Sequence, residues 1–210
     1  MRRGTVLVSF ALLLALSAGP APADKGDIVV RFGAQFSSPT GDLSETEGLD
    51  TMKLEADSTT GGGVSVEYMA SDLIGINTGI GFADTDVDAT LTAPGQPTQS
   101  ATLGTSTMMP LTVAANFHVA RSEKFDFYLG PEVGVVFYSD LDFNLPDEAD
   151  MRLEDDMAYG ANMGLDVPFS ERWAFCTNVK FLKTAADPKD DSGELDIDPW
   201  MVGVGFGVTF

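Results

Sequence analysis

Hydrophobic and small residues alternate with a period of two at the carboxyl end of the chain. The bulky residues of segment 200–210 share one parity: Trp200, Val202, Val204, Phe206, Val208 and Phe210. The positions between them are mostly glycine. Because successive side chains of a strand point to opposite faces, this segment has one bulky apolar face and one nearly bare face. The pattern predicts a strand of a small barrel whose outer surface meets lipid.

The same alternation recurs in seven earlier segments of the chain. They cover residues 27–36, 63–69, 74–82, 109–118, 125–138, 157–167 and 173–182. Apolar and polar residues that exchange at period two indicate strands with one apolar face. We therefore predict an all-β protein, an eight-stranded antiparallel up-and-down transmembrane β-barrel.

The connections between these segments alternate strictly between short and long. The short ones are 70–73, 119–124 and 168–172, and the long ones are 37–62, 83–108, 139–156 and 183–196. Outer-membrane barrels have short periplasmic turns and longer extracellular loops. If the first strand starts from the periplasm, the chain fits this arrangement. Most of the acidic residues then fall in the extracellular loops.

A soluble barrel of the lipocalin type also has eight up-and-down strands, but its polarity is reversed. Aromatic residues decide between the two barrels. In the membrane topology, one group gathers at the periplasmic strand ends: Tyr68, Phe117, Phe125, Trp173 and Phe210. A second group gathers at the extracellular ends: Phe36, Phe82, Phe137, Tyr159, Phe181 and Trp200. Two aromatic girdles around an aliphatic belt are typical of a barrel that crosses a membrane.

The amino-terminal segment has the pattern of a secretory signal peptide. Arg2 and Arg3 precede an apolar stretch at 6–16, and Ala21 and Ala23 supply small residues before Asp24. The apolar stretch is too short to span a membrane as a helix. We expect residues 1–23 to be removed on export and residues 24–210 to form a single barrel domain.

Charge and composition exclude several classes of function. The chain has 12 basic and 32 acidic residues and a formal net charge of −20, which disfavours nucleic acid as a partner. Cys176 is the only cysteine and His118 the only histidine, so we expect no metal site and no cofactor. No serine can be assigned to His118 from spacing, and a catalytic triad needs all its members within reach. We therefore do not expect an enzyme.

The inward face of the predicted strands combines polar and apolar residues. The polar ones lie in the periplasmic half or near the middle: Arg31, Glu67, Asn116, Asp126, Glu132, Asn178 and Lys180. An apolar vestibule is expected nearer the extracellular mouth: Val136, Ala158, Leu182 and Met201. The interior of an eight-stranded barrel is just wide enough for side chains to fill. Because an unpaired buried charge is costly, we expect the lumen cations to pair with the lumen carboxylates.

Two hypotheses describe this polar group. In the first it is a structural plug. In the second it closes the floor of a pathway that admits a hydrophobic solute through the apolar vestibule. The solute would then leave sideways, near Pro110 and Pro199, where proline removes ladder donors close to the outer rim. The hypotheses are compatible, because a closed floor favours a lateral exit.

Several motifs resemble the OmpW family of outer-membrane proteins. They are residues 26–34 followed by Pro39, residues 68–76, 127–134 and 159–166, the pair Arg172-Trp173, and residues 197–200 before the final Phe210. The resemblance implies an eight-stranded barrel with a narrow, largely apolar channel. It also implies uptake of small hydrophobic molecules, which are proposed to leave sideways into lipid. The chain departs from the family at Leu111, where a second proline is common, at Pro131, and in its more acidic loops.

We therefore expect a passive route for small hydrophobic molecules in the bacterial outer membrane. The expected partners are outer-membrane lipid and lipopolysaccharide, hydrophobic solutes, and the barrel-assembly machinery, which would engage the Phe210 end. The alternative is a structural or adhesive barrel with a sealed polar lumen and acidic surface loops.

Overall fold

The computed structural model describes residues 23–40, 44–46, 51–92, 98–139, 142–143, 155–184 and 198–210. All but the last residue of the expected signal peptide, 1–23, lies outside this described part. Within the described ranges, no helix is long and apolar enough to cross a membrane.

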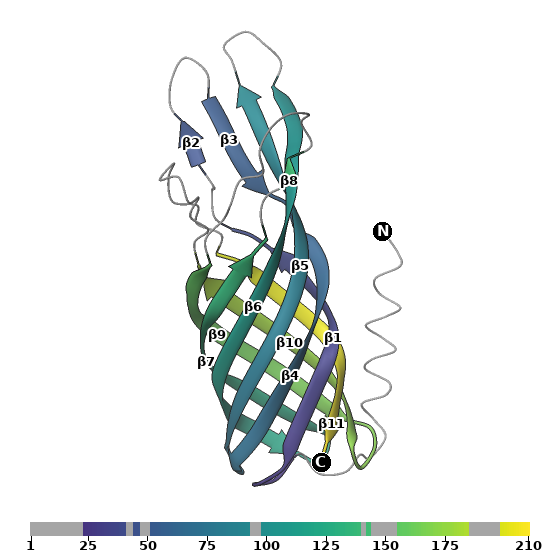
Figure 1. Ribbon diagram of the computed structural model, residues 1–210. Helices are drawn as coiled ribbons and strands as arrows, with labels where there is room; N and C mark the ends of the chain where they lie inside the picture. Colours follow the sequence, from purple (N-terminus) through teal and green to yellow (C-terminus); the bar gives the residue numbers. More distant parts are fainter. Residues whose placement is uncertain are drawn as a thin grey trace.

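Eight long strands form a closed barrel (Figure 1). They are β1 (Ile28–Ser38), β4 (Thr59–Ser71), β5 (Ile74–Thr92), β6 (Gln99–Ser122), β7 (Phe125–Tyr138), β9 (Asp156–Pro168), β10 (Trp173–Lys183) and β11 (Trp200–Thr209). Each strand pairs antiparallel with the next, and β1 pairs with β11 to close the barrel. The predicted eight-stranded antiparallel barrel is confirmed.

The prediction of an extracellular loop over residues 83–108 is wrong, because most of this segment is a β-hairpin. β5 continues to Thr92 and β6 already begins at Gln99. Beyond Phe82 the lipid-facing parity carries acidic residues, and the Oδ1 of Asp84 accepts a hydrogen bond from the Thr107 hydroxyl at 2.7 Å. The apolar alternation therefore ends where lipid ends, while the backbone ladder goes on.

A sheet of five strands rises above the barrel (Figure 1). Short strands β2 (Ser44–Thr46) and β3 (Thr51–Ala56) pair with each other, and β3 pairs with the extension of β5. Strand β8 (Asp142–Phe143) pairs with β6. The predicted loops 37–62 and 139–156 thus also contain strands. β2 and β8 are too short for a period-two pattern to reveal them, whereas the alternation of Met52 and Leu54 with Lys53 and Glu55 could have revealed β3.

The two faces of the barrel wall match the prediction. Large apolar side chains such as Phe32, Val113 and Val204 are exposed on the outside. The parity between them points inward and is buried, as at Thr112 and Ala114. The described barrel therefore presents a hydrocarbon-like surface to its surroundings and encloses a polar interior.

Glycines on the inner face make room for large side chains from neighbouring strands. A Cβ on Gly164 would collide with the ring and hydroxyl of Tyr128, and a Cβ on Gly75 would collide with the carboxylate of Glu67. The bare inner faces seen in the sequence are therefore the space into which the polar residues of the lumen fold.

Candidate functional site: the barrel lumen

Side chains divide the lumen into three layers. An ionic network fills the periplasmic end, a cavity of about 90 Å³ lies in the middle, and an apolar cluster closes the extracellular end. The layers touch: Arg31 and Tyr128 of the ionic network line the cavity from below, and Leu182 and Met201 of the apolar cluster line it from above.

Arg31 on β1 is the centre of the ionic network. One of its guanidinium nitrogens lies 2.6 Å from Oε2 of Glu67 on β4. Its Nε and a second terminal nitrogen donate to Oδ2 of Asp166, across the bore on β9, at 3.0 and 2.7 Å. The guanidinium also lies 4.9 Å from the centroid of the Tyr128 ring, a cation–π contact. Arg31 therefore joins three sides of the wall.

His118 on β6 links the remaining carboxylates of the network. Its Nδ1 lies 2.9 Å from Oδ1 of Asp126, and its Nε2 lies 3.4 Å from Oε1 of Glu67. The amide of Asn116 donates to the same Glu67 oxygen at 2.6 Å. Because His118 faces two carboxylates rather than a hydroxyl, the arrangement lacks the nucleophile of a Ser–His–Asp triad.

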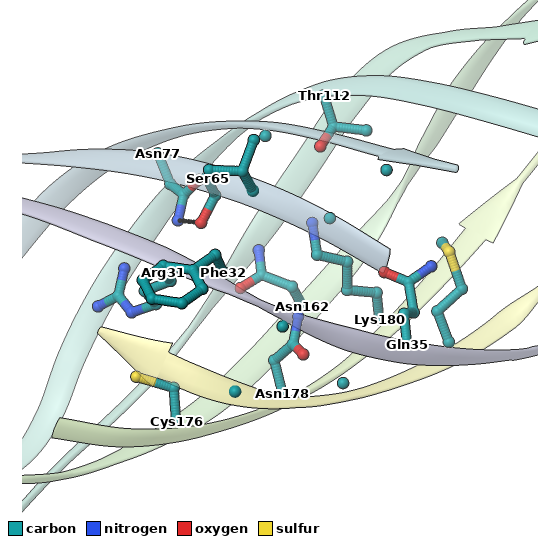
Figure 2. Close-up of a pocket in the computed structure, with 18 of the residues that line it drawn as sticks. Arg31, Phe32, Gln35, Ser65, Asn77, Thr112, Asn162, Cys176, Asn178 and Lys180 are labelled. Atoms are coloured by element: carbon teal, nitrogen blue, oxygen red, sulfur yellow. Dashed lines mark hydrogen bonds between the residues drawn. The ribbon is translucent and has the colours of Figure 1, made fainter. Parts of the chain in front are cut away.

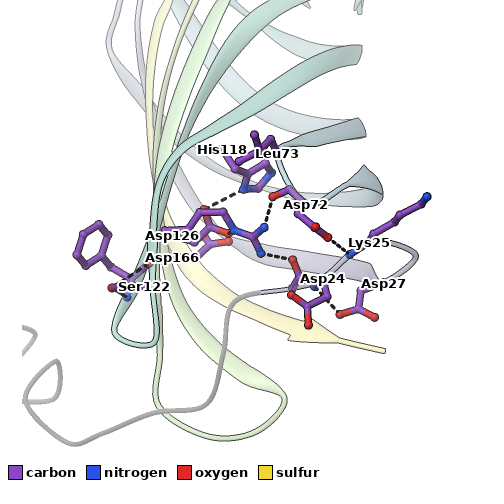
Figure 3. Close-up of polar contacts among 12 residues, drawn as sticks. Asp24, Lys25, Asp27, Asp72, Leu73, His118, Ser122, Asp126 and Asp166 are labelled. Carbon is purple, nitrogen blue, oxygen red and sulfur yellow. Dashed lines mark hydrogen bonds and ion pairs between the residues drawn. The ribbon is translucent and has the colours of Figure 1, made fainter.

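Arg121 connects the ionic network to the periplasmic rim, where Figure 3 shows Asp126, Asp72 and Lys25. Its Nε lies 3.3 Å from Oδ2 of Asp126, and its terminal nitrogens donate to the carbonyls of Ala23 and Asp72. Asp72 in the β4–β5 turn also accepts a hydrogen bond from the Lys25 backbone at 3.1 Å. The network thus holds the segment that leads into β1 against the barrel floor.

A second ion pair lies at the level of the cavity. Lys180 Nζ on β10 is 2.5 Å from Oε1 of Glu132 on β7, and the Thr112 hydroxyl donates to the same oxygen. Glu132 is only 1% exposed, so its charge depends on this pair. The structure therefore pairs the lumen cations with lumen carboxylates, as expected, and shows the partners: Arg31 with Glu67 and Lys180 with Glu132.

The mid-lumen cavity is lined by glycines and apolar side chains together with a set of uncharged polar side chains (Figure 2). Four amide side chains point into it: Gln35, Asn77, Asn162 and Asn178. Asn77 donates to Ser65 and Asn162 to the carbonyl of Gly130, both at 3.4 Å. The cavity wall is therefore mixed, and these amide side chains belong to its polar part.

The four residues of the expected apolar vestibule lie together and are joined by a fifth. Val136, Ala158, Leu182 and Met201 pack with Met108, and Tyr138 packs against them. All five core members are at most 5% exposed, so they form a closed cluster rather than an open funnel. Met108 was assigned to a loop in the sequence, and its inward parity on the extended β6 would have revealed it.

The β5–β6 ladder is interrupted next to Pro110. Paired residues run to Ile80 and Leu111 and resume at Ala83 and Met108. Pro110 is buried and lines the cavity, and its Cγ lies 3.6 Å from the place of a Cβ on Gly81. The interruption therefore borders the cavity directly.

Pro199 has a different environment. It is almost completely buried just before β11, and its carbonyl accepts a hydrogen bond from the Leu182 backbone at 3.2 Å. The β10–β11 ladder is continuous from Phe181–Trp200 onward. Of the two prolines, only Pro110 lies beside a gap in a ladder.

Sequence reasoning missed several members of the ionic network. They are Asp166, His118, Arg121 and Tyr128. Parity placed Asp166, His118 and Tyr128 inward, but the partners of an inward residue depend on the register between strands that are distant in sequence. In the part of the chain that the structure describes, no group of three or more His, Cys, Asp or Glu side chains could hold a metal ion.

Comparisons with known proteins agree with this architecture. The model of the OmpW family matches residues 24–210. Outer membrane protein W of Vibrio cholerae is 26% identical over 219 residues, which cover 97% of this chain and 98% of that protein. The crystal structure of OprG from Pseudomonas aeruginosa has a TM-score of 0.70 at 22% identity, covering 92% of this chain and 98% of that one.

A second similar structure is that of the outer membrane protein AlkL in lipid bilayers. Its TM-score is 0.60 at 17% identity, and the match covers 92% of this chain and 94% of that one. The structural matches show the fold, and the family model shows the lineage. The chain is therefore a β-barrel of the bacterial outer membrane that belongs to the OmpW family.

Proposed function

We propose that the protein is a passive route by which small hydrophobic molecules cross the outer membrane. One observation carries this proposal: the gap in the β5–β6 ladder at Pro110 borders the mid-lumen cavity. Proline has no backbone N–H, so at Pro110 the wall lacks one of the hydrogen bonds that hold neighbouring strands together. A solute in the cavity can reach lipid there by separating the two strands at the point where their pairing is weakened.

A second gap shows why the position of Pro110 matters. The β6–β7 ladder lacks pairs around Pro131, between Glu132 and Leu129. Behind this gap lies Asn116, whose amide is bound to Glu67 in the ionic network. Of these two gaps in the described barrel, the one at Pro110 borders the cavity, and we assign the lateral exit to it.

The ionic network favours a sideways path over a straight one. A solute that moved on to the periplasm would have to separate Arg31 from both Glu67 and Asp166. Breaking a buried ion pair costs about 3–5 kcal/mol. An apolar solute offers no compensating contacts to these charges, whereas the hydrocarbon outside the β5–β6 gap accepts it.

A disulfide across the gap tests the proposal. The variant Phe82→Cys/Met109→Cys, in a Cys176→Ser background, would join the two outward residues that face each other at the gap. The matched control, Ile76→Cys/Ala115→Cys, joins the same two strands where their ladder is complete. Uptake of an apolar tracer is measured in vesicles with a lipopolysaccharide outer leaflet, before and after reduction.

The proposal predicts slow uptake with the gap cross-linked, recovery on reduction, and no effect of the control cross-link. Equal uptake by both oxidised variants would contradict the lateral exit. If the unmodified protein gave no faster uptake than protein-free vesicles, the transport function itself would be wrong.

A structural or adhesive barrel is the second candidate function. The sheet formed by β2, β3, β5, β6 and β8 projects beyond the barrel, as a surface for partners outside the cell would. This candidate predicts that shortening the β5–β6 hairpin abolishes cell attachment and leaves tracer uptake unchanged. The transport proposal predicts that attachment does not depend on the hairpin.

We also propose how the chain reaches the membrane. Residues 1–23 would be removed on export, which leaves 24–210 as the barrel domain. Phe210 is exposed, and its backbone exchanges hydrogen bonds with Ile28 at 2.9 and 3.1 Å, so the carboxyl end lies at the closing seam of the barrel. An exposed aromatic end at this seam is the feature that we expect the barrel-assembly machinery to engage.

A further inference from the structure

We propose that the preferred solutes are neutral molecules with an apolar chain and one terminal hydrogen-bonding group, such as a medium-chain alcohol. This inference rests on the proposed function and names the chemical class of its solute. In it, the amides of Gln35 and Asn178 bind the polar group of the solute in the mid-lumen cavity and determine specificity.

The first support is the hydrogen bonding of the cavity. Among the described residues, the side-chain amides of Gln35 and Asn178 form no hydrogen bond, although both line the cavity. Both are half-buried. A pure hydrocarbon that displaced water from them would leave their donors and acceptors unsatisfied. A hydroxyl group can donate to one amide and accept from another, and so replaces the displaced water.

The second support is the position of Gln35. Its Oε1 lies 3.8 Å from the place of a Cβ on Gly81, opposite Pro110 in the interrupted part of the β5–β6 ladder. Gln35 thus reaches from β1 across the inside of β4 to the gap. A solute whose polar group is bound to Gln35 has its apolar chain beside the exit to lipid.

The other free amide lies across the cavity. The Oδ1 of Asn178, on β10, covers Gly203 of β11, where a Cβ would collide with it. In Figure 2, Asn178 and Asn162 point into the same space as Gln35 and Lys180. Polar groups therefore surround this space from several strands, as binding of one small polar group requires.

The third support is the charge balance of the lumen. Lys180, at the level of the cavity, is paired with Glu132 at 2.5 Å, and Arg31 below it is held by two carboxylates. Among the described residues that line the cavity, no cation is left to neutralise an anionic solute. A carboxylate in the cavity would be buried without a counterion, which is very costly. The site therefore favours neutral polar groups over anions.

The size of the cavity sets the shape of the solute. Its volume is about 90 Å³. This is smaller than the cavity of about 150 Å³ that binds benzene in an engineered protein core. The cavity holds a polar group and a few carbon atoms, and the rest of the chain must lie in the apolar cluster or in the gap. A single polar group at one end of the solute fits this division.

Three radiolabelled eight-carbon tracers test the inference: octane, 1-octanol and octanoate. Their initial uptake is measured in vesicles with a lipopolysaccharide outer leaflet and compared with protein-free vesicles. We expect the protein to accelerate 1-octanol more than octane and not to accelerate octanoate. Loss of one hydrogen bond in Gln35→Leu or Asn178→Leu should reduce the octanol-to-octane ratio about fivefold.

Matched variants separate specificity from folding. Gln35→Asn keeps an amide in the cavity and should retain part of the preference. Gln99→Leu changes an exposed glutamine on the hairpin and should leave the ratio unchanged. Folding of each variant is followed by its heat-dependent gel mobility. If Gln35→Leu does not fold, the octanol-to-octane ratio of Asn178→Leu tests the inference.

The outcomes are distinct. If no tracer is accelerated, both the proposed function and this inference are wrong. If octane is accelerated as much as 1-octanol, or if neither leucine variant changes the ratio, transport stands and the assigned solute class is overturned.

Discussion

The ionic network makes a strong prediction for the variant Arg31→Met. Methionine fills much of the volume of arginine but removes the charge and all of its hydrogen bonds. Glu67 and Asp166 would then lose the cation that they share. Their side chains are only 0% and 9% exposed, respectively. Tyr128 would lose the guanidinium that lies against its ring.

The expected loss follows from these contacts. Removing one partner of a buried ion pair costs about 3–5 kcal/mol, because it leaves an uncompensated charge. Glu67 keeps its contacts with Asn116 and His118, so we expect the lower end, about 3 kcal/mol. With a slope of roughly 2–6 kcal/mol per M of guanidinium, the unfolding midpoint falls by roughly 0.5–1.5 M.

The assay is equilibrium unfolding of the protein in lipid vesicles, followed by fluorescence of Trp173 and Trp200. Arg172→Met is the control, because it removes an exposed cation in the β9–β10 turn and should change stability by less than about 0.5 kcal/mol. The combined variant Arg31→Met/Glu67→Gln/Asp166→Asn removes the stranded charges and should recover a large part of the loss.

If Arg31→Met is as stable as the control, the buried charges are not coupled and the ionic network does not hold the floor. Failure of the combined variant to recover would show that Arg31 acts through its packing alone.

Two further predictions concern the wall and the second ion pair. Gly164→Ala should destabilise the barrel by about 1–3 kcal/mol, because the added methyl group collides with Tyr128. Gly81→Ala should be tolerated, since the nearest atoms lie 3.6 Å from the added methyl group. Equal effects of the two variants in thermal unfolding would refute the packing of the inner face. Lys180→Met should destabilise the barrel, because it leaves Glu132 buried without a cation. The double variant Lys180→Met/Glu132→Gln should regain most of the lost stability. A double variant no more stable than the single one in the same unfolding assay would contradict the pairing.

The sequence predicted the barrel strands well wherever lipid imposes alternation. The range predicted for β7, 125–138, is the one observed. The predicted β5 ended too early and the predicted β6 began too late, because Asp84 and Thr107 lie in strands that continue into water. In water, these strands need only their backbone hydrogen bonds, and many different side chains are compatible with them.

The lumen shows the opposite limit. Parity placed Arg31, Glu67 and Glu132 inside, and pairing of their charges could be expected because burial demands it. Parity could not show that Asp166 rather than another carboxylate completes the site around Arg31, or that His118 bridges two carboxylates. Those contacts depend on strand register and on the stagger of the closed barrel, which no single strand encodes.

The direction in which alternate side chains of β6 point is the most direct test of the account. Single cysteines at Leu111, Thr112, Val113 and Ala114, in a Cys176→Ser background, carry a nitroxide in protein reconstituted into vesicles. Collision rates with oxygen, which concentrates in hydrocarbon, are compared with those of a water-soluble nickel chelate. The account predicts high oxygen access at 111 and 113 and low oxygen access at 112 and 114. High oxygen access at 112 and 114 with chelate access at 111 and 113 would contradict it.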